Sequence, residues 1–128
     1  MSSHAKSLII KAQADLDLAK KHLDDEEQHD LVGYNLAQAT EQLLKALCGI
    51  RGLSYPSDED GHDLDLLVET LENGNFALIS SHADVIDLTQ YNSPKAYVRE
   101  DDRLDLEEYY GYVSELKKLV GEQLKLEK

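Results

Sequence analysis

The residue types best suited to binding chemistry lie close together between residues 91 and 103 of this 128-residue chain. Two rings that could stack on a base and three cations that could hold a phosphate occur there: Tyr91, Tyr97, Lys95, Arg99 and Arg103. Acidic residues 100–102 lie among the cations and would neutralise part of their charge. The segment predicts a local anion or nucleotide site, and the alternative is an ordinary interhelix loop whose tyrosines pack on the protein.

A second polar set lies on an otherwise apolar helix. Its members are spaced three, four and three residues apart: Asn35, Gln38, Gln42 and Lys45. The rest of that helix is apolar over more than half of its circumference, which indicates packing from several sides. Amides removed from water need hydrogen-bond partners, so this stripe predicts a cleft or a partner contact. Lys45 would complete the anion site if its stripe faced the loop at 91–103.

The sequence offers little evidence for a metal site or a reactive thiol. Glu26-x-x-His29 has the spacing of half a di-iron site, but it occurs once and inside a highly charged run, which favours a solvated surface. The acidic loop at 57–63 fails as a calcium loop, because setting Gly61 at position six places Pro56 at one and Leu67 at twelve. Cys48 is the single cysteine, on an apolar helix position, and predicts a buried reduced thiol.

Helical periodicity dominates the elements that must position these residues. It predicts helices over about 3–22 and 31–50, a third carrying Leu64, Leu67 and Leu71, a fourth ending near Tyr91, and a last one starting near Asp102. No alternating strand pattern competes. We therefore expect one domain over residues 1–128, an all-α, antiparallel bundle of four to five helices.

The charge excludes some classes of function. Lys and Arg number 13 against 26 Asp and Glu, a net charge of −13. This charge opposes binding to bulk nucleic acid or to an anionic membrane surface. No apolar run approaches membrane-spanning length, and the first residues lack a signal-peptide pattern, so we expect a cytoplasmic protein.

The order of these features resembles the HEPN domain family (higher eukaryotes and prokaryotes nucleotide-binding). The resemblance rests on the Ala- and Gln-rich helix at 34–47, the Gly/Pro loop at 49–56 and the helix start at His62-Asp63-Leu64. It implies a helical bundle and a homodimer. Genes of this family often encode the partner of a minimal nucleotidyltransferase, sometimes as a toxin–antitoxin pair.

The family's best-known activity is metal-independent RNA cleavage by an Arg followed four to six residues later by a His. The three arginines here are Arg51, Arg99 and Arg103; the first histidine after Arg51 is His62, eleven residues on, and none follows Arg99. The catalytic spacing is therefore absent. We expect no ribonuclease activity, with an RNA-cleaving toxin using a non-standard site at His62 as the alternative.

Small members of the family also carry a Tyr-x-x-Pro-x-Arg-Tyr-like segment between the last two helices. Tyr91, Pro94 and Tyr97 fit it, but Ala96 stands at the arginine position. Together these features predict a non-catalytic binding module without a cofactor. It would be a dimeric accessory partner of a minimal nucleotidyltransferase, a nucleotide binder, or both, and the remaining alternative is a purely structural helical adaptor.

Overall fold

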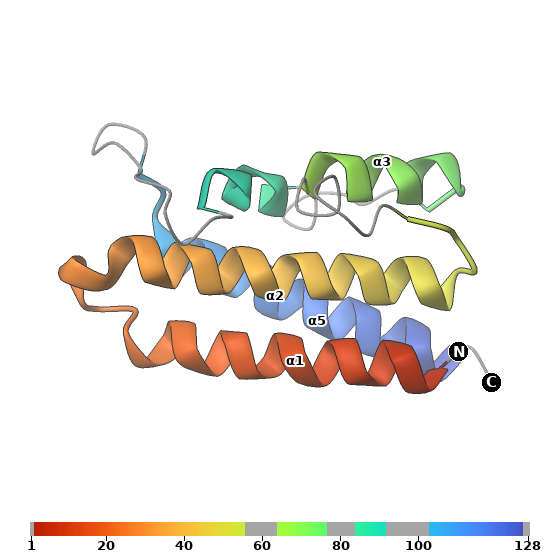
Figure 1. Ribbon diagram of the computed structural model, residues 1–128, viewed down its shortest axis with the longest axis horizontal. Helices are drawn as coiled ribbons and strands as arrows, with labels where there is room; N and C mark the ends of the chain where they lie inside the picture. The colour runs from red at the N-terminus through yellow and green to blue at the C-terminus, as the bar shows by residue number, and fades with distance from the viewer. Residues whose placement is uncertain (1, 56–63, 77–83, 92–102, 127–128) are drawn as a thin grey trace.

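The computed structural model describes residues 2–55, 64–76, 84–91 and 103–126, and every regular element within them is a helix. In chain order they are α1 (Ser2–Lys21), the short 3₁₀ helix η1 (Glu26–Gln28), α2 (His29–Ile50), α3 (Leu64–Asn73), the 3₁₀ helix η3 (Val85–Tyr91) and α5 (Leu106–Leu126). The expected all-α bundle is confirmed (Figure 1).

Helix α2 is the centre of the bundle and contacts each of the other helices. Figure 1 shows α1 along one side of α2, α3 and η3 along the opposite side, and α5 behind. The chain reverses between α1 and α2, so these two helices are antiparallel. Helix α5 runs parallel to α2, because Arg103 lies beside His29 at one end and Leu126 beside Ile50 at the other.

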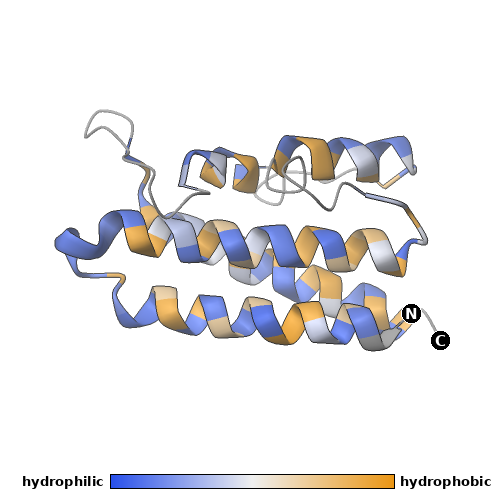
Figure 2. Cartoon of the chain, viewed as in Figure 1, coloured by the Kyte–Doolittle hydropathy of each residue, from blue (hydrophilic) through white to orange (hydrophobic). Residues whose placement is uncertain are grey.

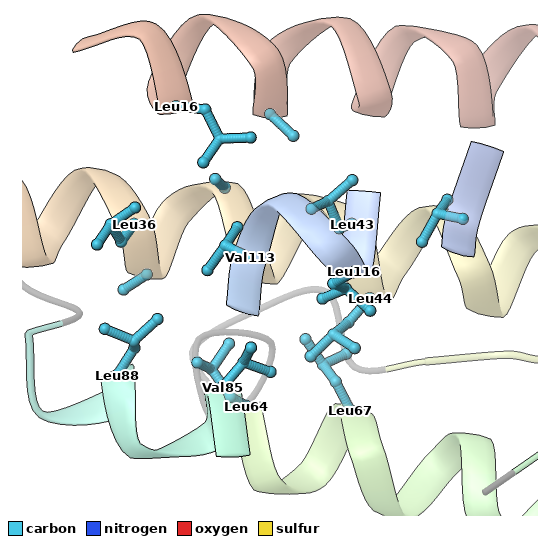
Figure 3. Close-up of a cluster of buried hydrophobic side chains, with 14 of the residues drawn as sticks. Leu16, Leu36, Leu43, Leu44, Leu64, Leu67, Val85, Leu88, Val113 and Leu116 are labelled. Atoms are coloured by element: carbon cyan, nitrogen blue, oxygen red, sulfur yellow. The ribbon is translucent and has the colours of Figure 1, made fainter. Parts of the chain in front are cut away.

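The core forms where the apolar faces of these helices meet around α2. Leu36, Leu43, Leu44 and Leu47 are completely buried, and in Figure 3 Leu16 of α1 lies on one side of α2 with Leu88 of η3 on the other. Burying each leucine contributes about 2 kcal/mol. Figure 2 shows hydrophilic and hydrophobic patches alternating along the long helices, as expected for amphipathic helices that cover a shared core.

The periodicity places most helices correctly, and Cys48 is buried as expected. Burial raises the pKa of its thiol to about 11, so it is protonated at neutral pH. Residues 85–91 form a 3₁₀ helix where we expected the end of an α-helix. Three residues per turn align Val85, Leu88 and Tyr91 in one row, and all three are buried against the core.

The expected start of the last helix near Asp102 is wrong, because α5 begins at Leu106. Asp105 is the cap: its carboxylate Oδ1 accepts a hydrogen bond from the backbone N–H of Glu108 at 3.3 Å. Arg103 therefore lies in the connection before α5. Across the described part of the chain, no helix is both long and apolar enough to span a bilayer.

Candidate functional site

The polar stripe on α2 makes hydrogen bonds inside the bundle. The amide Nε2 of Gln42 donates to Oδ2 of Asp15 on α1 at 3.2 Å, and Nζ of Lys45 pairs with Oε2 of Glu41 at 2.8 Å. Asn35 is buried and Gln38 is half-buried. Gln42 therefore lies at the packed α1–α2 contact, and the ion pair of Lys45 lies within α2 itself.

The contact between Gln42 and Asp15 leaves one buried polar atom without a hydrogen bond. Burial raises the pKa of the Asp15 carboxyl, and the hydrogen bond from Gln42 opposes that shift. The amide oxygen Oε1 of Gln42 is buried with no hydrogen-bond partner. A carboxylate offers this oxygen no donor, so the pair leaves one buried acceptor unsatisfied.

The predicted anion-binding residues fall into two groups. Lys95, Tyr97 and Arg99 lie outside the described residues, whereas Tyr91 and Arg103 lie at the end of the bundle where α2 begins. Lys45 is not with them. It follows Gly33, which touches the Tyr91 ring, by twelve residues, about 18 Å along a helix.

Tyr91 joins three segments that are distant in the sequence. Its ring packs on the backbone of Gly33 in α2 and is 1% exposed. Its hydroxyl is hydrogen-bonded to Nε2 of His29 at 2.8 Å and accepts the backbone N–H of Leu104 at 3.0 Å. The rings of Tyr91 and His29 pack edge to face, with their centroids 5.5 Å apart. These contacts fasten the connection before α5 to the start of α2.

Sequence reasoning missed His29, which it placed in a solvated charge run. The signal was present: His29 precedes Val32 and Gly33 by three and four residues, so all three share the inner face of α2. The histidine is half-buried instead of fully solvated.

Both polar groups of this contact are held neutral. Burial, and then the positive charge of Arg103, lower the pKa of His29, while the carboxylates of Asp30 and Glu26 oppose the shift. Burial is also the main cause that raises the pKa of Tyr91. A neutral tyrosine hydroxyl can accept the N–H of Leu104 and donate to the unprotonated Nε2 of a neutral histidine, which satisfies both the hydroxyl and the N–H of Leu104.

An open pocket of about 360 Å³ adjoins His29. Its lining combines apolar, acidic and basic side chains: Leu23, Asp24, Glu26, His29, Arg103, Leu104, Asp105, Leu106 and Glu107. Arg103 Nη1 pairs with Oε2 of Glu26 at 3.2 Å at the surface. The lining has four carboxylates and one guanidinium, so the pocket carries a net negative charge. It suits a cationic side chain better than a phosphate.

The structure gives no support to a metal centre in the part of the chain that it describes. Glu26 pairs with Arg103, and His29 is bonded to Tyr91. Within the described ranges, no three or more His, Cys, Asp or Glu side chains are grouped so that they could hold an ion. The acidic loop at 57–63, which includes His62, lies outside those ranges.

Comparison with known proteins agrees with this architecture. The family model of the HEPN domain matches residues 5–124, nearly the whole chain. The search of curated proteins and the search of solved structures return no match. A match of this extent, on a bundle with these helices, shows that the chain belongs to the HEPN domain family.

Proposed function

We propose that this protein is a non-catalytic HEPN binding module, a dimeric accessory subunit that engages a minimal nucleotidyltransferase, a nucleotide, or both, in the cytoplasm. The observation that carries the proposal is the missing catalytic spacing. None of the three arginines is followed four to six residues later by a histidine. A family member without that pair keeps the helical scaffold and lacks the groups that would transfer a proton and stabilise a phosphate.

The electrostatics favour a protein partner with a basic surface. A net charge of −13 steers basic partners toward this chain and repels free nucleotides over most of its surface. The pocket beside His29 adds carboxylates that can receive lysine or arginine side chains, with Leu23 and Leu106 available to cover their methylene stems.

Co-expression tests this proposal. If a small nucleotidyltransferase is encoded beside this gene, it is expected to co-purify with the chain, and Glu26→Lys with Glu107→Lys is expected to weaken that complex about tenfold or more. The matched control is Glu69→Lys with Glu72→Lys on α3, where both glutamates are exposed far from the pocket. If the Glu26→Lys, Glu107→Lys variant kept full affinity, the partner would have to bind another face of the protein. A neighbouring nucleotidyltransferase that does not bind would remove the accessory role.

One observation favours a second candidate, an RNA-cleaving toxin. His29 and Arg103 line the same pocket, so a histidine and an arginine meet in space although they are far apart in sequence. Against it stand the Arg103–Glu26 ion pair and the acidic lining, which repel an RNA backbone. We expect no RNA hydrolysis by the purified protein and no growth arrest on induced expression. Cleavage that is lost in His29→Ala or His62→Ala would establish the toxin instead.

Nucleotide binding is tested separately by calorimetry with ATP. Lys95→Glu with Arg99→Glu is expected to abolish any binding that the wild type shows, because these are the cations closest to Tyr91 and Tyr97 in sequence. Affinity unchanged by this double reversal would place the nucleotide elsewhere. A wild type that binds neither ATP nor a nucleotidyltransferase would be a structural adaptor.

A further inference from the structure

The pocket beside His29 already holds one guanidinium, that of Arg103. Nη1 of Arg103 lies 3.2 Å from Oε2 of Glu26, and both side chains line the pocket. Burial, followed by the positive charge of Arg103, lowers the pKa of His29, so the guanidinium also acts on the imidazole. The structure therefore shows that a guanidinium fits between Glu26 and His29.

Arg103 is fastened near its backbone and loosely held at its tip. The next residue, Leu104, donates its backbone N–H to the hydroxyl of the buried Tyr91 at 3.0 Å. The ion pair at the tip lies in solvent, with 33% of the Arg103 side chain and 87% of the Glu26 side chain exposed. Exposed pairs of this kind favour association of their members only about twofold to fivefold. The guanidinium can therefore leave Glu26 while the backbone of residues 103 and 104 stays in place.

The rest of the lining suits a second cation. Three further exposed carboxylates line the pocket: Asp24, Asp105 and Glu107. Arg103 neutralises only one of the four negative charges, so the pocket attracts cations even while the Arg103–Glu26 pair is formed. The most direct guide to the cation that fits is the one that the chain itself places there, a guanidinium on an arginine stem.

We propose that this pocket binds an arginine side chain of a protein partner, and that Arg103 acts as an internal competitor which that arginine displaces from Glu26. The inference rests on the proposed function for the existence of a basic partner, and it names the side chain that the partner inserts. Because Arg103 is tethered beside Glu26, it competes at a constant effective concentration. It therefore weakens the binding of every single cation, and only a partner with further contacts binds tightly.

Other occupants match the pocket less well. A phosphate group would meet four carboxylates and only one guanidinium. A metal ion would need several converging ligands, and within the described residues no three acidic, histidine or cysteine side chains are grouped to provide them. A lysine ammonium is a compact and strongly hydrated charge, and it does not reproduce the planar group that Arg103 presents to Glu26.

Displacement is observed directly by nuclear magnetic resonance of the full isotope-labelled chain, titrated with an acetylated and amidated triarginine peptide. The chain has three arginines, so it gives three Nε–H signals, and Arg103→Gln identifies the one from Arg103. The peptide is expected to move that signal toward its position in Glu26→Gln, where the ion pair is absent. If the signals of His29 and Leu104 shifted while that of Arg103 did not, Arg103 would not be a competitor. If none of these signals responded, the pocket would not be an arginine site.

A double-mutant cycle separates competition from a simple effect of charge. Arg103→Gln is expected to tighten peptide binding about twofold to fivefold more in the wild type than in a Glu26→Gln background, where there is no ion pair to break. Equal gains in the two backgrounds would mean that Arg103 only repels the peptide. Lys20→Gln is the matched control, because it removes one exposed positive charge on α1, and it should change the dissociation constant less than about twofold. A trilysine peptide should bind severalfold more weakly, and equal affinity would overturn the assignment to arginine.

The result can be judged apart from the proposed function, because the titration uses no nucleotidyltransferase. Displacement of Arg103 by the peptide, in a chain that forms no complex with a neighbouring nucleotidyltransferase, would support this inference and remove the accessory role. A nucleotidyltransferase complex that forms although the peptide leaves Arg103 in place would support the accessory role and overturn this inference.

Discussion

The close approach of Gly33 to Tyr91 gives the sharpest prediction for stability. A methyl group added at Gly33 would lie 2.3 Å from Cδ1 and 2.4 Å from Cγ of Tyr91, well inside van der Waals contact. The ring cannot move outward without cost, because it is 1% exposed and its hydroxyl is bonded to two other segments. Gly33→Ala must therefore displace Tyr91.

The size of the effect follows from three contributions. Overpacking costs about 1–3 kcal/mol, and displacement of the ring weakens the hydrogen bonds to His29 and Leu104, about 1 kcal/mol each. Alanine regains about 1 kcal/mol through its better helix propensity. We expect a net loss of about 3 kcal/mol in the free energy of unfolding.

Urea unfolding followed by circular dichroism measures this loss as a lower midpoint with an unchanged slope. The matched control is Gly111→Ala in α5, where an added methyl meets nothing within 4 Å, and stability is expected to rise by about 1 kcal/mol. In a Tyr91→Ala background the contact is gone, so Gly33→Ala is expected to become stabilising. Equal or greater stability of Gly33→Ala in the wild-type background would refute this account of the contact.

Three further predictions concern the polar contacts. Tyr91→Phe keeps the ring but leaves the N–H of Leu104 unpaired, so unfolding should require about 1–2 kcal/mol less free energy, measured by the same urea titration; unchanged stability would mean that water replaces the hydroxyl. The pKa of His29 is lowered in the folded state, so the unfolded chain takes up a proton first as the pH falls below the ordinary value of 6.5, and stability decreases there until the folded histidine is protonated too. His29→Gln should remove that part of the pH dependence between pH 7 and 5, and an identical pH profile would exclude the histidine as its source. The pKa of Asp15 is raised, so its charge opposes folding at neutral pH. Asp15→Asn removes that charge and offers a donor to Oε1 of Gln42, and we expect about 1 kcal/mol of added stability at pH 7, which a thermal melt showing no increase would contradict.

Much of the fold could be predicted from the sequence because helices are encoded locally. The spacing of Leu36, Leu43 and Leu47 identifies the inner face of α2, and all three are completely buried. The same periodicity places Cys48 in the core. The one large boundary error, at the start of α5, also has a local cause, since Asp105 and Glu108 have the spacing of a helix cap.

The candidate site could be predicted only in part, because its members come from distant segments. Tyr91 and Arg103 were recognised as residues able to bind, but the residues that they contact were not. Lys45 was expected to join them only if its stripe faced their loop, and it lies about 18 Å along α2 from the Gly33 that Tyr91 contacts. Nothing in the spacing of residues 29 and 91 indicates that His29 and Tyr91 share a hydrogen bond across 62 positions.

The sequence by itself determined the helical elements, their buried faces and the excess of negative charge, because each depends on composition or on neighbours within a few residues. Only the tertiary structure decided which polar groups meet. Side-chain hydrogen bonds and ion pairs act over a few ångströms, and the path of the chain between helices sets which groups come that close. That path pairs Arg103 with Glu26 and surrounds it with further carboxylates, so the pocket beside His29 is negatively charged. The sequence around Arg103 had instead suggested a site for anions.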